Sequence, residues 1–209
     1  MNIVFDFGVV LFDWQPAQFL ATDLPEFANT PQAARQLAHA LFGHEDWHAF
    51  DRGTLSMDEV VQRSAQRLAL PHDRLDQLIQ RIGELLTPVA GTVGLLDQLA
   101  QRRERDGELK LYFLSNMPVP YARELEQRHA FLQRFDGGIF SGDVQLIKPE
   151  PAIYALLESR YALNPAETLF IDDLKSNVIA AQGRGWQGLH FENPAQLGAA
   201  LDHLLGSPP

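Results

Sequence analysis

The sequence contains no cysteine, and none of its apolar stretches reaches the roughly 18 residues that a membrane-spanning helix needs. Without cysteine, neither disulfide bonds nor thiolate metal sites can form. The amino terminus lacks the positively charged region with which a secretory signal peptide begins. From these absences we expect a soluble, cytoplasmic protein that is not embedded in a membrane.

Basic residues are also scarce. The chain has 17 lysines and arginines against 27 aspartates and glutamates, which gives a formal net charge of −10. The one local basic cluster, residues 102–105, includes Glu104 and suits the charged end of a helix better than a groove for a phosphate backbone. We therefore expect no nucleic-acid partner.

Length and composition indicate a globular protein. The 209 residues suit one domain, or one core with a subdomain, and the sequence leaves open whether the chain is a monomer or a homodimer. Hydrophobic residues make up 45% and charged residues 21%, so the chain can bury a sizeable core and does not have a disordered composition.

The first thirteen residues carry the first sign of a site. The run Ile3–Phe5 is β-branched and aromatic without polar alternation, which predicts a buried strand. Asp6 follows it directly, Gly8 marks a turn, and a second apolar run over 9–12 ends at Asp13. Asp6 therefore stands at the carboxyl end of a strand, where open α/β sheets bind ligands. Taken alone, it could equally cap the turn that follows.

The rest of the chain changes from helical to alternating structure. Residues 14–87 contain amphipathic stretches over 31–41, 56–70 and 73–86, and we expect about four helices there. From residue 88 onward, predicted strands (109–114, 138–140, 168–171, 188–191) alternate with predicted helices (92–105, 121–131, 150–161, 175–182, 194–205). Alternation of this kind predicts an α/β fold with a parallel sheet. The four terminal residues, 206–209, are expected to fray.

Polar residues follow the later strands as well. They are Ser115 and Asn116, Lys148, and the pair Asp172 and Asp173. Each has an ordinary explanation alone, as a turn, a solvated side chain or a helix cap. Parallel strands, however, bring their carboxyl ends to one edge, so these groups should meet Asp6. One lysine cannot neutralise three carboxylates, which would repel one another without a further cation, and oxygen ligands of this kind suit Mg²⁺.

The order of these motifs resembles the haloacid dehalogenase (HAD) superfamily. The motifs are Asp-x-Gly after the first strand, then Ser-Asn, Lys-Pro and Asp-Asp-(x)3-Asn at later strand ends. The resemblance implies a Rossmann-like core formed by residues 1–13 and 88–209, and an all-helical cap of the family's C1 type formed by residues 14–87. It also implies a Mg²⁺-dependent phosphatase that acts on a small phosphorylated metabolite, a sugar phosphate being one example.

The resemblance assigns a role to each motif residue. Asp6 would be the nucleophile that forms an aspartyl-phosphate, and Lys148 would neutralise charge on Asp6 and the phosphate. Ser115 and Asn116 would bind the phosphoryl group. Mg²⁺ would be held by Asp6, the backbone carbonyl of Gly8 and Asp173, with Asp172 acting through water and Asn177 holding their loop.

The sequence departs from the family pattern at Gly8. Phosphatases of the family usually carry a second aspartate there, as a general acid and base, yet the chain resembles glucose-1-phosphate phosphatase-like members that share the Asp-x-Gly form. Three explanations stay open: a leaving group that needs little protonation, a proton from elsewhere such as the cap, or slow or vestigial catalysis. His44 and His48, in a polar segment of the cap, are candidate proton donors.

Two other functions fit the same motifs. In a haloacid dehalogenase the same aspartate attacks carbon and needs no metal, so the Asp172–Asp173 pair argues against this chemistry. A non-catalytic binding protein that keeps the fold is the second alternative. Retention of Asp6, Lys148 and Asp173 argues against that alternative. The identity of the substrate is not encoded in any motif.

Overall fold

The computed structural model describes residues 1–206, with only the backbone described at Asp106; of the tail expected to fray, residues 207–209 lie outside the described part. The strands are β1 (Asn2–Phe5), β2 (Phe12–Asp13), β3 (Thr87–Pro88), β4 (Lys110–Ser115), β5 (Gly137–Phe140), β6 (Thr168–Asp172) and β7 (Gln187–His190). The first five helices are α1 (Pro16–Asp23), α2 (Pro31–Phe42), α3 (Glu45–Arg52), α4 (Met57–Leu68) and α5 (His72–Leu85).

The later helices alternate with the strands of the sheet. They are α6 (Ala90–Asp106), α7 (Val119–Arg128), α8 (Ser141–Val144), α9 (Pro151–Tyr161), α10 (Lys175–Gln182) and α11 (Pro194–Leu205), with short 3₁₀ turns η1 (Ala130–Arg134) and η2 (Pro165–Glu167). No helix in the described chain combines the length and the apolar character required to cross a membrane.

Five strands form one parallel sheet in the order β5-β4-β1-β6-β7, with β1 at its centre. Side chains alternate between the two faces of the sheet. Ile3 and Phe5 pack on the face that α6, α7 and α11 cover, while Val4 packs with residues of α9 and α10 on the other face. The prediction of an α/β fold with a parallel core sheet is therefore confirmed.

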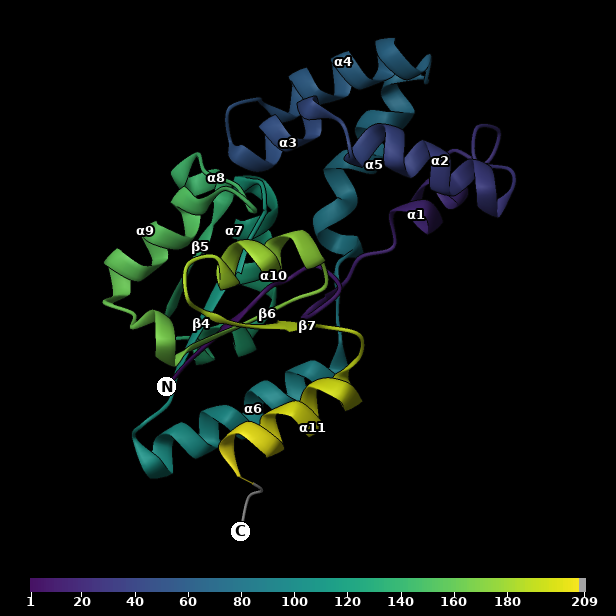
Figure 1. The fold of residues 1–209 in the computed structure, drawn as a ribbon. Helices are drawn as coiled ribbons and strands as arrows, with labels where there is room; N and C mark the ends of the chain where they lie inside the picture. The colour runs from purple at the N-terminus through teal and green to yellow at the C-terminus, as the bar shows by residue number, and fades with distance from the viewer. Residues whose placement is uncertain (207–209) are drawn as a thin grey trace.

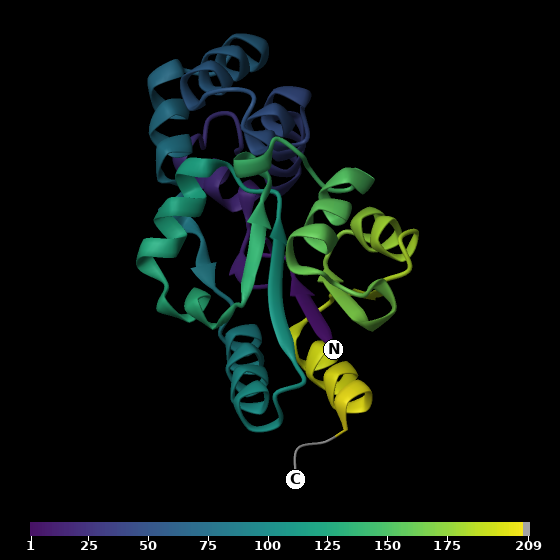
Figure 2. The same ribbon diagram turned by 90° about the vertical axis from the view of Figure 1, so that its left-hand side faces the viewer.

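Helices α1–α5 lie together at one end of the molecule, opposite the end where α6 and α11 pack side by side (Figure 1). Viewed from the side, the teal and green sheet strands β4 and β5 point toward this insert (Figure 2). The chain enters and leaves the insert through β2 and β3, which pair antiparallel so that Asp13 lies opposite Thr87. The carboxyl edge of the sheet thus faces the helical insert.

The insert has five helices in the described chain, where the sequence predicted about four. The predicted stretches over 31–41, 56–70 and 73–86 match α2, α4 and α5, so α1 and α3 had not been placed. The eight residues of α1 include only one fully buried side chain, Leu20. A helix so short, with so little burial, leaves almost no periodic apolar pattern to recognise. A capping box begins α4, because the side chains of Ser56 and Glu59 each accept a hydrogen bond from the other's backbone N–H group.

Candidate active site

Asp6 lies directly after the central strand, at the carboxyl edge of the sheet. Its backbone N–H donates to the carbonyl oxygen of Ile171, 2.9 Å away, which continues the pairing with β6 by one residue. The Asp6 side chain is almost buried, and its Oδ1 accepts a hydrogen bond of 2.7 Å from the N–H of Phe7. The sheet thus fixes both the position and the orientation of this carboxylate.

Lys148 joins two of the predicted carboxylates. Its Nζ lies 2.7 Å from Oδ1 of Asp6 and 2.7 Å from Oδ2 of Asp172, and the lysine is only 3% exposed. Burial alone lowers the pKa of an amine, but the charges of Asp172 and Asp6 outweigh it and raise the pKa of Lys148 above its usual value. Lys148 is therefore a permanent ammonium group at the bottom of the site.

Asn116 holds the backbone of Lys148 in place. Its Nδ2 donates to the Lys148 carbonyl oxygen over 3.0 Å, and its Oδ1 accepts from the Lys148 N–H over 2.8 Å. The residue after β4 thus fixes the loop before α9. Sequence reasoning placed Asn116 at the site through its backbone N–H and missed this role of its side chain.

Asp172 is completely enclosed by hydrogen-bond donors. Besides Lys148, its Oδ1 accepts from the N–H of Leu174 over 2.8 Å, and Asn177 Nδ2 lies 3.0 Å from both of its oxygens. Asp172 is fully buried, and it is not among the residues that line the cavity described below. The prediction that Asn177 holds this loop agrees with these distances.

Asp6, Asp172 and Asp173 form an acidic cluster that suits a cation. One oxygen of each lies within 4.8 Å of the others. Burial is the main cause that raises the pKa of Asp6 above its usual range, although the charge of Lys148 opposes this effect. Burial and the charge of Asp172 together raise the pKa of Asp173 to about 6. A divalent ion would relieve this excess of negative charge, and an all-oxygen donor set fits Mg²⁺.

The turn after Asp6 has an unusual backbone. Val9 has a φ of 61°, a left-handed conformation that β-branched residues rarely adopt. Both the Leu11 and Phe12 N–H groups donate to the carbonyl oxygen of Phe7, which tightens the turn. Val9 and Gly8 consequently lie against the cavity. Such strained residues gather at functional sites, where the surrounding structure holds them in place.

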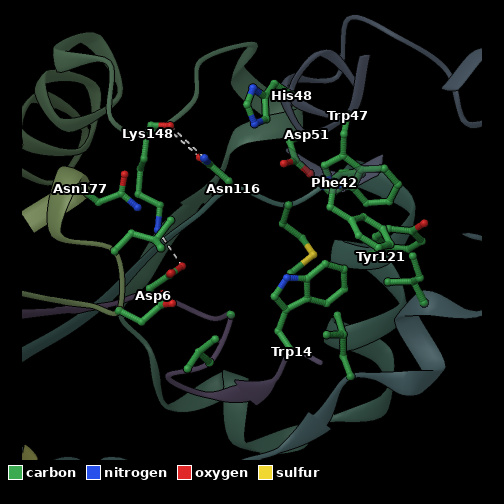
Figure 3. A pocket seen from close by; sticks show the side chains of 18 residues that line it. Asp6, Trp14, Phe42, Trp47, His48, Asp51, Asn116, Tyr121, Lys148 and Asn177 are labelled. Carbon is green, nitrogen blue, oxygen red and sulfur yellow. Dashed lines mark hydrogen bonds and ion pairs between the residues drawn. The ribbon is translucent and has the colours of Figure 1, made fainter. Parts of the chain in front are cut away.

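A cavity of about 280 Å³ opens above these groups, between the sheet edge and the helical insert. Figure 3 shows a polar side, with Asp6, Lys148 and Asn177, facing an aromatic side that carries Trp14, Phe42, Trp47 and Tyr121. Its remaining lining residues are Gly8, Val9, His48, Asp51, Ile82, Leu86, Asn116, Met117, Pro118, Asp173 and Leu174. The insert therefore supplies most of the wall opposite the charged groups.

Besides Asp172, two predicted residues do not line the cavity. Ser115, the last residue of β4, is 1% exposed and does not line it, so a contact between its hydroxyl and a phosphoryl group stays a prediction. His44 caps α3, where its Nδ1 accepts from the Asp46 N–H over 3.1 Å. His48 does line the cavity. The aromatic residues and Asp51 were not predicted as site residues.

A parallel sheet with an acidic cluster at its carboxyl edge, covered by a helical insert after the first strand, defines an α/β protein with a Rossmann-like core and a candidate cation site. Comparison of the sequence with known protein families gives a more specific assignment. Residues 4–185 match the family model described as haloacid dehalogenase-like hydrolase. The chain belongs to this family, as its motifs predicted.

Individual relatives agree with this assignment. Sesquiterpene phosphatase astK of Aspergillus oryzae is 28% identical over 97% of this chain and 95% of its own length. A HAD family enzyme from Bacteroides thetaiotaomicron, solved with magnesium and inorganic phosphate, has a TM-score of 0.69 at 19% identity, covering 92% of this chain and 94% of that one. L-2-haloacid dehalogenase from Xanthobacter autotrophicus has a TM-score of 0.67 at 22% identity, covering 100% and 84%.

Proposed function

We propose that the protein is a Mg²⁺-dependent phosphatase that hydrolyses a small phosphate monoester through an aspartyl-phosphate on Asp6. The observation that carries this proposal is the position of Lys148, whose ammonium lies 2.7 Å from Asp6 and 2.7 Å from Asp172 beside a third carboxylate, at the bottom of the cavity. The positive charges of the Lys148 ammonium and of a cation held by the carboxylates would offset the negative charge of a phosphoryl group beside Asp6. The similarity to a sesquiterpene phosphatase supports the same chemistry.

Each polar residue has a task in this mechanism. Asp6 attacks phosphorus, and Lys148 stabilises the charge that the phosphoryl oxygens carry. The hydroxyl of Ser115 and the backbone N–H of Asn116 orient those oxygens. Asp6, Asp173 and the Gly8 carbonyl would hold the metal, with Asp172 acting through water. When bound, Mg²⁺ neutralises the phosphate and favours the ionised form of Asp6.

The helical insert, residues 14–87, acts in this proposal as a cap over a core of residues 1–13 and 88–209. Three contacts support its docking. Arg52 of α3 pairs through both of its terminal nitrogens with Glu150, Ser141 donates its hydroxyl hydrogen to the carbonyl oxygen of Asp51, and Tyr121 donates to that of Ile79 over 2.6 Å. A docked cap excludes water from the reacting phosphoryl group.

The cavity wall favours an alcohol with an apolar body over a sugar. Trp14, Phe42, Trp47 and Leu86 offer aromatic and aliphatic surface, whereas a sugar would require hydrogen-bond partners for several hydroxyls. The named activity of the relative astK supports an apolar substrate as well. We therefore place alkyl, aryl and isoprenoid phosphates ahead of sugar phosphates as substrates.

A phosphatase screen with and without metal tests the proposed function. We expect release of inorganic phosphate from apolar monoesters in Mg²⁺, loss of at least about 100-fold after chelation with EDTA, and recovery when Mg²⁺ is added back. The same preparations are assayed for halide release from 2-chloropropionate. Halide release that EDTA leaves unchanged, without phosphate release, would favour the dehalogenase alternative, and inactivity in both assays would favour a binding protein.

Trp14→Ala is expected to weaken selection for apolar substrates. Trp14 lines the cavity and packs edge-on against Phe42, with their ring centroids 5.1 Å apart. Loss of this surface should lower the ratio of kcat/KM between decyl phosphate and methyl phosphate about tenfold, since about 55 Å² of lost apolar contact at roughly 25 cal/mol per Å² is worth about 1.4 kcal/mol. An unchanged ratio would contradict an apolar binding wall at this position.

A further inference from the structure

Gly8 leaves the leaving-group oxygen without the proton donor that family phosphatases usually carry at this position. Resting on the proposed phosphatase function, we infer that Asp51, from the last turn of α3 in the helical insert, is the general acid and base of the reaction. It donates a proton to the departing alcohol oxygen and then accepts one from the attacking water. Nothing in the sequence motifs assigns a role to this residue.

Asp51 has the position that such a group needs. It lines the same cavity as Asp6, Asn116 and Lys148. Figure 3 shows its carboxylate between the polar side of the cavity and the aromatic side formed by Phe42 and Trp47. Phosphate bound over Asp6 would direct its alcohol toward the aromatic wall, so the ester oxygen would lie between these two sides, where Asp51 is.

The carboxyl group of Asp51 is not occupied by a structural role. Its oxygens make no hydrogen bond or ion pair with any residue in the described part of the chain, whereas Asp172 uses both of its oxygens in such bonds. Asp51 is half-buried and its side chain faces the cavity, so no protein group competes for its carboxyl there. An unpartnered carboxyl that faces a cavity is therefore available to a substrate.

The backbone around Asp51 is nevertheless firmly held. The hydroxyl of Ser141 donates to the Asp51 carbonyl oxygen, and the Met117 N–H donates to the Ser141 oxygen over 2.8 Å. The neighbouring residue, Arg52, pairs with Glu150 from the core. These contacts join α3 to the loops after β4 and β5. Because these contacts tie α3 to the core, they fix the position of Asp51 relative to Asp6.

The surroundings of Asp51 keep its proton in place. Burial raises the pKa of Asp51 well above its usual range, although the charge of Lys148 opposes this effect. The other titratable groups around the cavity are Tyr121 from α7, His48 from α3 itself, and Asp6 and Asp173 from the sheet edge. A raised pKa favours the protonated carboxyl, which is the form that donates a proton to a departing alkoxide.

The two steps balance as follows. In the first, Asp6 Oδ bonds to phosphorus, the phosphorus–oxygen bond to the alcohol breaks, and the proton of Asp51 moves to the departing oxygen. In the second, the Asp51 carboxylate takes a proton from water, whose oxygen bonds to phosphorus while the bond to Asp6 breaks. The products are the free alcohol and inorganic phosphate, and Asp51 is protonated again.

His48 is the competing candidate, since it lines the same cavity. Its side chain is exposed, and Figure 3 shows it next to Asp51, which follows one helical turn later in α3. Water reaches an exposed imidazole, so the cap does not isolate its proton for the substrate. Comparing His48→Ala with Asp51→Asn separates the two candidates.

Two matched substrates test the inference. 4-Nitrophenyl phosphate releases a stable anion that needs no proton, while 4-nitrobenzyl phosphate has nearly the same shape and releases a basic alkoxide. For Asp51→Asn we expect kcat/KM to fall about 10²–10⁴-fold on the benzyl ester, and less than about tenfold on the phenyl ester. Both rates are measured on one preparation, so their ratio is independent of how much of the protein is folded.

A second variant makes the test specific to proton transfer. No atom lies within 4 Å of a side-chain carbon built at Gly8, so Gly8→Asp fits and restores the carboxyl of the usual family pattern. We expect Gly8→Asp in the Asp51→Asn background to recover at least about tenfold on the benzyl ester. Asp58→Asn, on the exposed first turn of α4, is the control and should leave the ratio unchanged.

The outcomes are distinguishable. Equal losses on both esters in Asp51→Asn, or a selective loss in His48→Ala instead, would overturn the role of Asp51. If the wild type releases no phosphate from either ester, the proposed function fails, whatever Asp51 does. A selective loss that Gly8→Asp repairs supports the inference, because a merely structural defect in α3 would not respond to a carboxyl added after β1.

Discussion

Asp6→Asn is expected to lower phosphate release about 10⁴-fold or more on every substrate, because an amide cannot act as the nucleophile. The substitution keeps the shape of the side chain, and the amide oxygen can still accept from the Phe7 N–H and from Lys148. The loss should appear in kcat, since the amide leaves the cavity and its binding wall intact. Phosphate release under saturating Mg²⁺ measures it.

Stability measurements control for a folding defect in this variant. Asp6 is a buried carboxylate whose surroundings raise its pKa, so the neutral amide should fold at least as well in the absence of metal. We expect a melting temperature in EDTA equal to or above that of the wild type. Activity within tenfold of the wild type, in a variant with this stability, would exclude Asp6 as the nucleophile.

Lys148→Met should also have a large effect, on both activity and stability. The variant removes the ammonium that neutralises Asp6 and Asp172, and we expect kcat to fall about 10²–10³-fold, as for other groups that stabilise developing charge. Removal of one partner of a buried ion pair typically costs about 3–5 kcal/mol, because the remaining charges stay buried. A lower melting temperature in EDTA is the second expected result.

The pH dependence of this stability loss has a definite sign. Burial raises the pKa of Asp6 and Lys148 opposes this rise, so in Lys148→Met that pKa is higher than in the wild type. The folded variant therefore takes up a proton at Asp6 as the pH falls, and its stability difference from the wild type should shrink. Lys110→Met is the matched control, since Lys110 is exposed and its ion pair with Asp136 lies at the surface. A Lys148 variant that keeps full activity would contradict the proposed charge neutralisation.

The sheet and its polar edge could be predicted because they leave local signals in the sequence. Ile3–Phe5 and Leu169–Ile171 are continuous apolar runs, and an aspartate follows each directly, Asp6 in one case and Asp172 in the other. Parallel pairing then makes convergence of Asp6, Asp172 and Asp173 a consequence of topology alone. Predicting that these three aspartates meet therefore required no knowledge of side-chain contacts.

The cavity wall could not be predicted, because it is formed by packing between distant segments. Trp14 lies where the chain enters the insert, Phe42 ends α2 and Tyr121 belongs to α7. In the sequence, each of them resembles an ordinary aromatic residue of the core. The clamp of Asn116 on Lys148 spans 32 positions and leaves no local pattern. Asp51 stands among other charged residues of α3, and only the fold shows which of them faces the substrate.

Chemical trapping of the intermediate tests the central claim most directly. Borohydride reduces an acyl phosphate to an alcohol but leaves a free carboxylate unchanged. Enzyme quenched with borohydride during turnover of a phosphate monoester in Mg²⁺ should therefore carry homoserine in place of Asp6, detected by mass spectrometry of the amino-terminal peptide. Substrate-free samples and Asp6→Asn should show no such change. Rapid turnover with position 6 unmodified, or with the modification at another aspartate, would contradict the assignment of Asp6 as the nucleophile.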